Sequence, residues 1–173
     1  MPGYEPFMLC DFHVHTTWSD GRLSVREVID LYGQTGRFDV IAITDHVLTQ
    51  RDLLGRAGKM LSLGLKDFSV TEPRFEAYLA DIRAEAERAR AKYDLLVIPG
   101  AEITQNHIRA HHNAHIVALN LTHYISADQP AEHILREIRR QGGLSIACHP
   151  HHRTTRRFEI ATSYMWDHRK SLV

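Results

Sequence analysis

Short apolar runs alternate with amphipathic segments along most of this chain. Runs of this length, rich in Ile, Val and Leu, are typical of buried strands, and there are five of them: residues 7–10, 39–44, 95–99, 115–119 and 144–148. Segments with the apolar spacing of a helix lie between them, at residues 24–33, residues 72–92 and from Pro130 to about Gly142. Ser24 and Glu27 have the spacing of a capping box at the start of the first helix. This alternation predicts an α/β fold with a largely parallel sheet and helices outside it.

Two stretches interrupt the alternation. Residues 47–70 contain three glycines and scattered basic residues, and they are too long for a simple connection. We therefore expect an insertion or a lid there. Residues 154–171 have only a weak helical pattern, and we expect a helix there.

The composition is that of an ordinary globular domain, and 173 residues are enough for one domain with a real core. Lys and Arg together number 21, as do Asp and Glu, so the charge gives no reason to expect nucleic acid or an anionic membrane as partner. No apolar run approaches the roughly 20 residues of a membrane helix. Cys10 and Cys148 lie in apolar runs and are expected to be reduced core thiols, which fits a cytoplasmic location.

Potential metal ligands gather at the ends of the predicted strands. His13 and His15 are two positions apart, so their imidazoles point to the same face of an extended chain. Asp20 lies in the loop just beyond them. Comparable side chains follow or begin the other strands: His46, Glu102, His115 and His149. Imidazoles and carboxylates that converge at one edge of a sheet predict a site for more than one zinc, manganese or iron ion.

Glu102 is the candidate bridge between two such ions. It is the one acid of this set that follows an apolar strand and an expected tight turn at Pro99-Gly100. Metal ions held by a bridging carboxylate can polarise a phosphoryl oxygen, generate hydroxide near neutral pH and neutralise the leaving oxygen. This arrangement favours a hydrolase.

Five motifs, in this order, resemble those of the PHP (polymerase and histidinol phosphatase) superfamily. They are Asp11–Gly21 (DFHVHTTWSDG), Ile43–His46 (ITDH), Gly100–Ile103 (GAEI), His115–Leu119 (HIVAL) and Cys148–Pro150 (CHP). The resemblance implies a single PHP domain over residues 1–173, folded as a distorted seven-stranded (β/α)7 barrel. It also implies two to three divalent metal ions (Mn, Zn or Fe) and the hydrolysis of phosphate esters, with a small phosphomonoester or a nucleotide as substrate.

The resemblance further implies how the ligands are shared. The three sets are His13, His15 and Glu102 for one metal, Glu102, His115 and His149 for the second, and Asp20 and His46 for the third. We expect Glu102, Asp20 and His46 to be the catalytic residues. A fork of guanidinium donors suits a phosphate group, so Arg22, Arg153 and Arg156 are candidates for binding the substrate.

The family pattern is incomplete in this chain. The Asp-x-His motif expected on the last strand is missing, because Asp167 and His168 are adjacent and lie in a helix-like stretch. About five strands are visible where seven are expected. We therefore expect that the C-terminal strands are absent from this chain, or that the site is reduced to one or two metals. An open sheet edge beside residues 144–148 would then be available for self-association.

Two further functions stay open. An amidohydrolase-like metal hydrolase of C–N bonds shares the His-x-His on its first strand, but it usually needs a bridging lysine, and no lysine here follows a strand end. The other is a non-catalytic PHP module that only binds metal. Asp11 and Asp45 are expected to orient the metal-binding histidines rather than to bind metal themselves.

Overall fold

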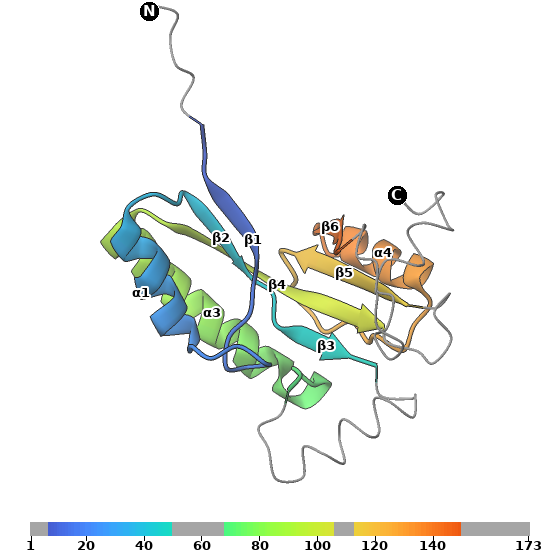
Figure 1. The fold of residues 1–173 in the computed structure, drawn as a ribbon. Helices are drawn as coiled ribbons and strands as arrows, with labels where there is room; N and C mark the ends of the chain where they lie inside the picture. Colours follow the sequence, from blue (N-terminus) through green and yellow to red (C-terminus); the bar gives the residue numbers. More distant parts are fainter. Residues whose placement is uncertain (1–6, 50–67, 106–112, 150–173) are drawn as a thin grey trace, which may run out of the picture.

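A computed structural model describes residues 7–49, 68–105 and 113–149 (Figure 1). In these residues the elements are β1 (Cys10–Val14), α1 (Val25–Thr35), β2 (Val40–Ile43), β3 (His46–Leu48), α3 (Glu72–Tyr93), β4 (Leu96–Gln105), β5 (Ala114–Leu119), α4 (Ala131–Arg140) and β6 (Leu144–Ala147). The expected helix at 154–171 and most of the expected insertion at 47–70 lie outside the described residues. Within them, no helix is both long and apolar enough to cross a membrane.

The helices begin and end close to where the sequence predicts. Ser24 is the N-cap of α1, its hydroxyl accepts from the backbone of Glu27, and the Glu27 carboxylate accepts from the backbone of Ser24. The helix closes at Gly36, which has the positive φ of 60° that glycine adopts without strain. The predicted capping box is thus confirmed.

The strands form one mixed sheet in the order β1-β2-β4-β5-β6, with β3 paired to β4. β2 pairs in parallel with β1 and β4, and β3 is also parallel to β4, but β5 is antiparallel to β4 and β6 is antiparallel to β5. The prediction of a largely parallel sheet is therefore wrong for the second half of the chain. Only residues 106–113 connect β4 to β5, and a parallel crossover needs about a dozen residues or more.

These two reversals decide where the candidate ligands lie. Because β5 runs against β4, its first residues lie beside the last residues of β4, and Thr104 is opposite His115. The second reversal makes β6 run in the direction of β4 again, so Cys148 and His149 follow it at the same edge. The first residues of β5 and the residues that follow β6 therefore lie at the same edge of the sheet as the last residues of β4.

The expected strand at 39–44 is β2, and the chain pairs with β4 a second time just beyond it. β2 ends opposite Pro99, and after Thr44 and Asp45 the chain resumes as β3, in which His46 is opposite Glu102. The hydroxyl of Tyr78, in α3, lies at this break: it accepts from the Asp45 backbone (3.2 Å) and is within donating distance of the carbonyls of Gly100 (2.9 Å) and Ile43 (3.3 Å). The first residues of the expected insertion thus belong to the sheet.

β4 is longer than predicted and passes through Pro99 and Gly100 without a turn. Pro99 is the last residue that pairs with β2, so the missing N–H falls where one neighbour ends. A Cβ on Gly100 would lie 2.5 Å from the carbonyl oxygen of Ala118, so β5 can approach only a glycine here. Glu102 accordingly lies inside a ten-residue strand rather than after a turn.

α1 packs against α3, and α3 packs against β4, while α4 packs against β5 and β6 (Figure 1). The core contains fully buried side chains from α1, α3 and the sheet: Ile29, Ile41, Leu79, Ile82 and Ile103. Residues of β1 and β5 are in contact although two strands separate them, so the sheet is curled.

Both edges of the described sheet expose apolar side chains. Phe7 and Met8 are 87% and 66% exposed and precede β1, so the prediction of a buried strand at residues 7–10 is wrong. β1 has only one neighbouring strand in the described sheet, so it forms an edge of that sheet. At the other edge, Leu144 and Ile146 of β6 are 69% and 41% exposed, as expected beside residues 144–148.

Candidate metal centre

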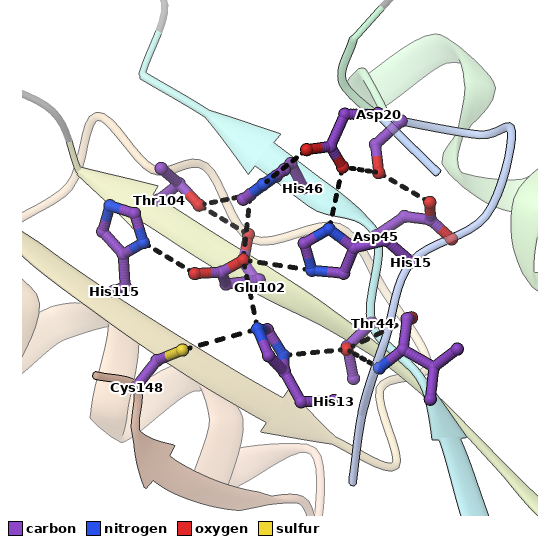
Figure 2. Close-up of polar contacts among 12 residues, drawn as sticks. His13, His15, Asp20, Thr44, Asp45, His46, Glu102, Thr104, His115 and Cys148 are labelled. Atoms are coloured by element: carbon purple, nitrogen blue, oxygen red, sulfur yellow. Dashed lines mark hydrogen bonds and ion pairs between the residues drawn. The ribbon is translucent and has the colours of Figure 1, made fainter. Parts of the chain in front are cut away.

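Glu102 is the centre of the site. Its side chain is completely buried on β4, and imidazole nitrogens surround both carboxylate oxygens (Figure 2). The nitrogen-to-oxygen distances are 3.0 Å from His46, 3.2 Å from His15 and 3.7 Å from His13 to Oε2, and 2.6 Å from His115 and 3.8 Å from His149 to Oε1. The structure thus brings all five predicted histidines around the one predicted bridging carboxylate.

Asp20 covers this cluster on its solvent side. The loop after β1 places its Oδ1 2.8 Å from Nδ1 of His15 and its Oδ2 3.7 Å from Nε2 of His46 (Figure 2). About half of the Asp20 side chain is exposed, so its carboxylate borders solvent. Asp20 and Glu102 therefore approach the same pair of imidazoles from two directions.

The donor atoms form two groups that share Glu102. In each group all donors lie within 4.8 Å of one another, and the two groups are His13, Glu102, Cys148 and His149, and His15, His46 and Glu102. The first pairs His13 with His149, whereas the family resemblance pairs it with His15. The number of metal ions and the division of ligands among them stay predictions.

Two polar atoms of the centre are buried and lack a hydrogen bond in the described part of the chain: Nε2 of His15 and Oε2 of Glu102. They lie 3.2 Å apart, too poorly aligned for a hydrogen bond, and both belong to the second donor group. A buried polar atom without a hydrogen bond is costly, and a cation between donors of this type would satisfy both. The residues present therefore fit a divalent metal ion.

Charge in the cluster is arranged as in a site that holds a cation. Burial alone would raise the pKa of Glu102, but the adjacent His115, His15 and His46 hold it far below its usual range. Burial alone would lower the pKa of His15, but the carboxylates of Glu102 and Asp20 raise it to about 9. Without metal, the anionic Glu102 thus stabilises a proton on His15.

Two threonine hydroxyls contact ring nitrogens of the histidines. Oγ1 of Thr44 is 3.2 Å from Nδ1 of His13, and Oγ1 of Thr104 is 2.8 Å from Nδ1 of His46 (Figure 2). A partner of this kind fixes the orientation of an imidazole ring. The sequence analysis missed both, although Thr104 is two residues after Glu102 and so lies on the same face of β4.

We expected Asp11 and Asp45 to contact the imidazoles, but in the described residues they bind other donors. The buried Asp45 accepts from the backbone and hydroxyl of Thr16, both at 2.8 Å, and from the Ser19 hydroxyl at 2.6 Å. Asp11 accepts from the backbone of His13 and from the Tyr32 hydroxyl. Both acids bind backbone and hydroxyl donors around β1 and the loop that carries Asp20, so they support the chain rather than the rings.

Cys148 also lies in the centre, and the sequence did not indicate this position. It is buried as predicted, but its Sγ lies 3.5 Å from Nε2 of His13 and within the first donor group (Figure 2). Burial and the nearby Glu102 carboxylate raise the pKa of its thiol well above the usual range. The available sequence signal was its position directly before the candidate ligand His149.

The three arginines proposed for phosphate binding are only partly placed. Arg22 is exposed and lies two residues after Asp20 in the chain, just before the helix α1. Arg153 and Arg156 lie outside the described residues. Their role in binding a substrate stays a prediction.

No protein-family model matches this chain. It is 32% identical over 68 residues to the DNA polymerase/3'-5' exonuclease PolX of Bacillus subtilis (strain 168), a match that covers 39% of this chain and 12% of that protein. A similar solved structure is that of a protein of Bifidobacterium adolescentis, whose assignment as a metal-dependent phosphoesterase is itself an inference. The two chains are 19% identical, the match covers 78% of this chain and 33% of the other, and the TM-score is 0.38. The chain spans a third or less of each of these two proteins.

Proposed function

We propose that this protein is a metal-dependent hydrolase of phosphate esters with a PHP-type, incompletely closed (β/α)7 barrel. The observation that carries the proposal is Glu102, a buried carboxylate on β4 with five imidazoles around its two oxygens. Burial of a charge is costly unless opposite charges or metal ions compensate it. A donor set of nitrogen and oxygen atoms with this density suits zinc, manganese or iron.

In this proposal seven side chains hold two to three divalent ions: His13, His15, Asp20, His46, Glu102, His115 and His149. Bound divalent ions would polarise a phosphoryl oxygen and lower the pKa of a bound water. Glu102 fixes the positions of the imidazoles around it, and Asp20 and His46 border the solvent side where a substrate would enter. Arg22, Arg153 and Arg156 would bind the phosphate group of a small phosphomonoester or nucleotide.

Hydrolysis of C–N bonds is less well supported. That chemistry usually needs a lysine between the metals, and Lys92 is the only lysine among the described residues. Lys92 lies in the last turn of α3, where its ammonium is 3.7 Å from the carboxylate of Asp30. A lysine in that ion pair is not part of the histidine cluster.

The test is a panel of phosphomonoesters, nucleotides and phosphodiesters assayed with manganese, zinc and iron, together with a measurement of metal content. We expect turnover with at least one metal, and we expect Glu102→Gln to lose activity and metal together. Glu87→Gln, an exposed position on α3, is the matched control and should behave as the unmodified protein. Bound metal without turnover of any ester would instead identify a non-catalytic metal-binding module.

A further inference from the structure

The position of Cys148 suggests more than a core thiol. It follows β6, and its backbone N–H donates to the carbonyl of His115 at 2.9 Å, which holds it beside the start of β5. Cys148 belongs to a small apolar cluster with Ala42 and Val117, yet its sulfur is 3.5 Å from Nε2 of His13. The sulfur is therefore located between the core and the histidine cluster.

The spacing of the donor atoms is that of a closed metal site. A tetrahedral ion with bonds of about 2.0–2.3 Å separates its ligand atoms by roughly 3.3–3.8 Å. Three distances in this group fall within that range: 3.5 Å from Cys148 Sγ to His13 Nε2, 3.7 Å from His13 Nε2 to Glu102 Oε2, and 3.8 Å from His149 Nε2 to Glu102 Oε1. All the donor atoms of the group lie within 4.8 Å of one another.

The backbone at His149 accounts for how two consecutive residues reach one site. In an extended strand, Cys148 and His149 would point to opposite faces of the sheet. His149 has a φ of 50°, in the left-handed region that residues other than glycine rarely adopt. This bend brings the imidazole back to the Glu102 carboxylate while the sulfur stays beside His13, and such strain concentrates at functional sites.

We propose that Cys148 is a metal ligand, and that with His13, Glu102 and His149 it forms a mixed sulfur, nitrogen and oxygen site that selects zinc, cobalt or iron over manganese and magnesium. This inference rests on the proposed function, because it assigns the class of metal to one part of that centre. On binding, the S–H bond breaks, the proton leaves to the solvent, and the sulfur donates its electron pair to the metal. Thiolate is a soft ligand, and hard cations such as magnesium prefer oxygen.

The test is a cobalt(II) titration of the full chain, of Cys148→Ser and of the control Cys10→Ser, which changes the cysteine outside the donor group. The unmodified protein and Cys10→Ser should show a near-ultraviolet thiolate-to-cobalt charge-transfer band together with visible cobalt bands. Cys148→Ser should keep the visible bands and lose the charge-transfer band. The ratio of its zinc affinity to its manganese affinity should fall at least about tenfold. This is the lower end of the loss of metal affinity seen when a residue that only contacts a ligand is replaced.

Zinc-edge X-ray absorption of the unmodified protein provides a measurement that does not depend on a variant that folds. A sulfur scatterer at about 2.3 Å, beyond nitrogen and oxygen at about 2.0–2.1 Å, supports the inference. Cobalt binding with no charge-transfer band, or zinc with only nitrogen and oxygen neighbours, overturns it while the proposed function stands. If the unmodified protein binds neither cobalt nor zinc, the inference fails, and the proposed function fails with it only if manganese and iron do not bind either.

Discussion

His46 and Glu102 lie directly opposite each other on the paired strands β3 and β4, and their side chains approach within 3.0 Å (Figure 2). β2 and β3 keep one register along β4 on either side of Thr44 and Asp45, since Ile43 is opposite Pro99 and His46 is opposite Glu102. This common register thus places His46 of the second donor group beside Glu102.

Removal of the Thr104 hydroxyl should weaken metal binding without unfolding the protein. In Thr104→Val, Nδ1 of His46 loses its contact at 2.8 Å and keeps only Glu102 Oε2 at 3.0 Å, so the imidazole is less well oriented. We expect metal affinity to fall about 10–100-fold, measured by calorimetric titration. Thr122→Val removes a hydroxyl in an exposed loop and should leave the affinity unchanged. Equal affinities for all three proteins would exclude a role for Thr104.

Tyr78→Phe should destabilise the protein through the break between β2 and β3. The variant loses a buried hydroxyl that contacts the backbone of Asp45, Gly100 and Ile43, and these groups have no access to water. The expected loss is about 1–3 kcal/mol of unfolding free energy, measured by denaturant titration. Tyr93→Phe is the control, because its hydroxyl contacts the partly exposed Asp30, where water can replace it, and the loss of unfolding free energy should be smaller.

The stability of the metal-free protein should fall as the pH rises from about 6.5 to about 9. The pKa of His15 is raised from 6.5 to about 9, so its protonated form stabilises the folded state fully below pH 6.5, and this contribution is lost as the pH passes through 9. Thermal melts with a chelator would measure this trend. The slope should be smaller in His15→Gln and unchanged in His133→Gln, which alters an exposed histidine of α4. With saturating zinc the stability should instead rise with pH, because metal binds only the deprotonated imidazole. The prediction is contradicted if the stability of the unmodified metal-free protein does not change with pH.

The open edge at β6 should mediate self-association. Leu144 and Ile146 are exposed on β6, the last strand at this end of the described sheet, and an edge strand with apolar side chains favours pairing with a second copy. We expect a concentration-dependent dimer in sedimentation experiments, and a monomer for the double variant Leu144→Lys, Ile146→Lys. Leu31→Lys, at an exposed apolar position on α1, should not change the association. A monomer at all concentrations would show that the edge is covered in another way.

The sequence by itself determined the helices, most strands and the identity of the candidate ligands. Ser24, Glu27 and the apolar stripe of α1 act over a few residues, so the capping box and the helix follow from local spacing alone. His13 and His15 share a face because the side chains of any extended chain alternate. Glu102 stood out because it is an acid next to an apolar run, and such an acid is costly to bury without a compensating charge.

The tertiary structure decided the direction of β5 and β6, the break between β2 and β3, and the residues that support the ligands. Strand direction and register depend on pairing between residues far apart in the chain, and local propensity does not specify that pairing. Thr104 and Cys148 are therefore ordinary residues in the sequence, and they gain a possible role only because β3 and β6 bring His46 and His149 to Glu102. Local chemistry specified which groups could bind a cation, and non-local strand pairing specified which of them meet.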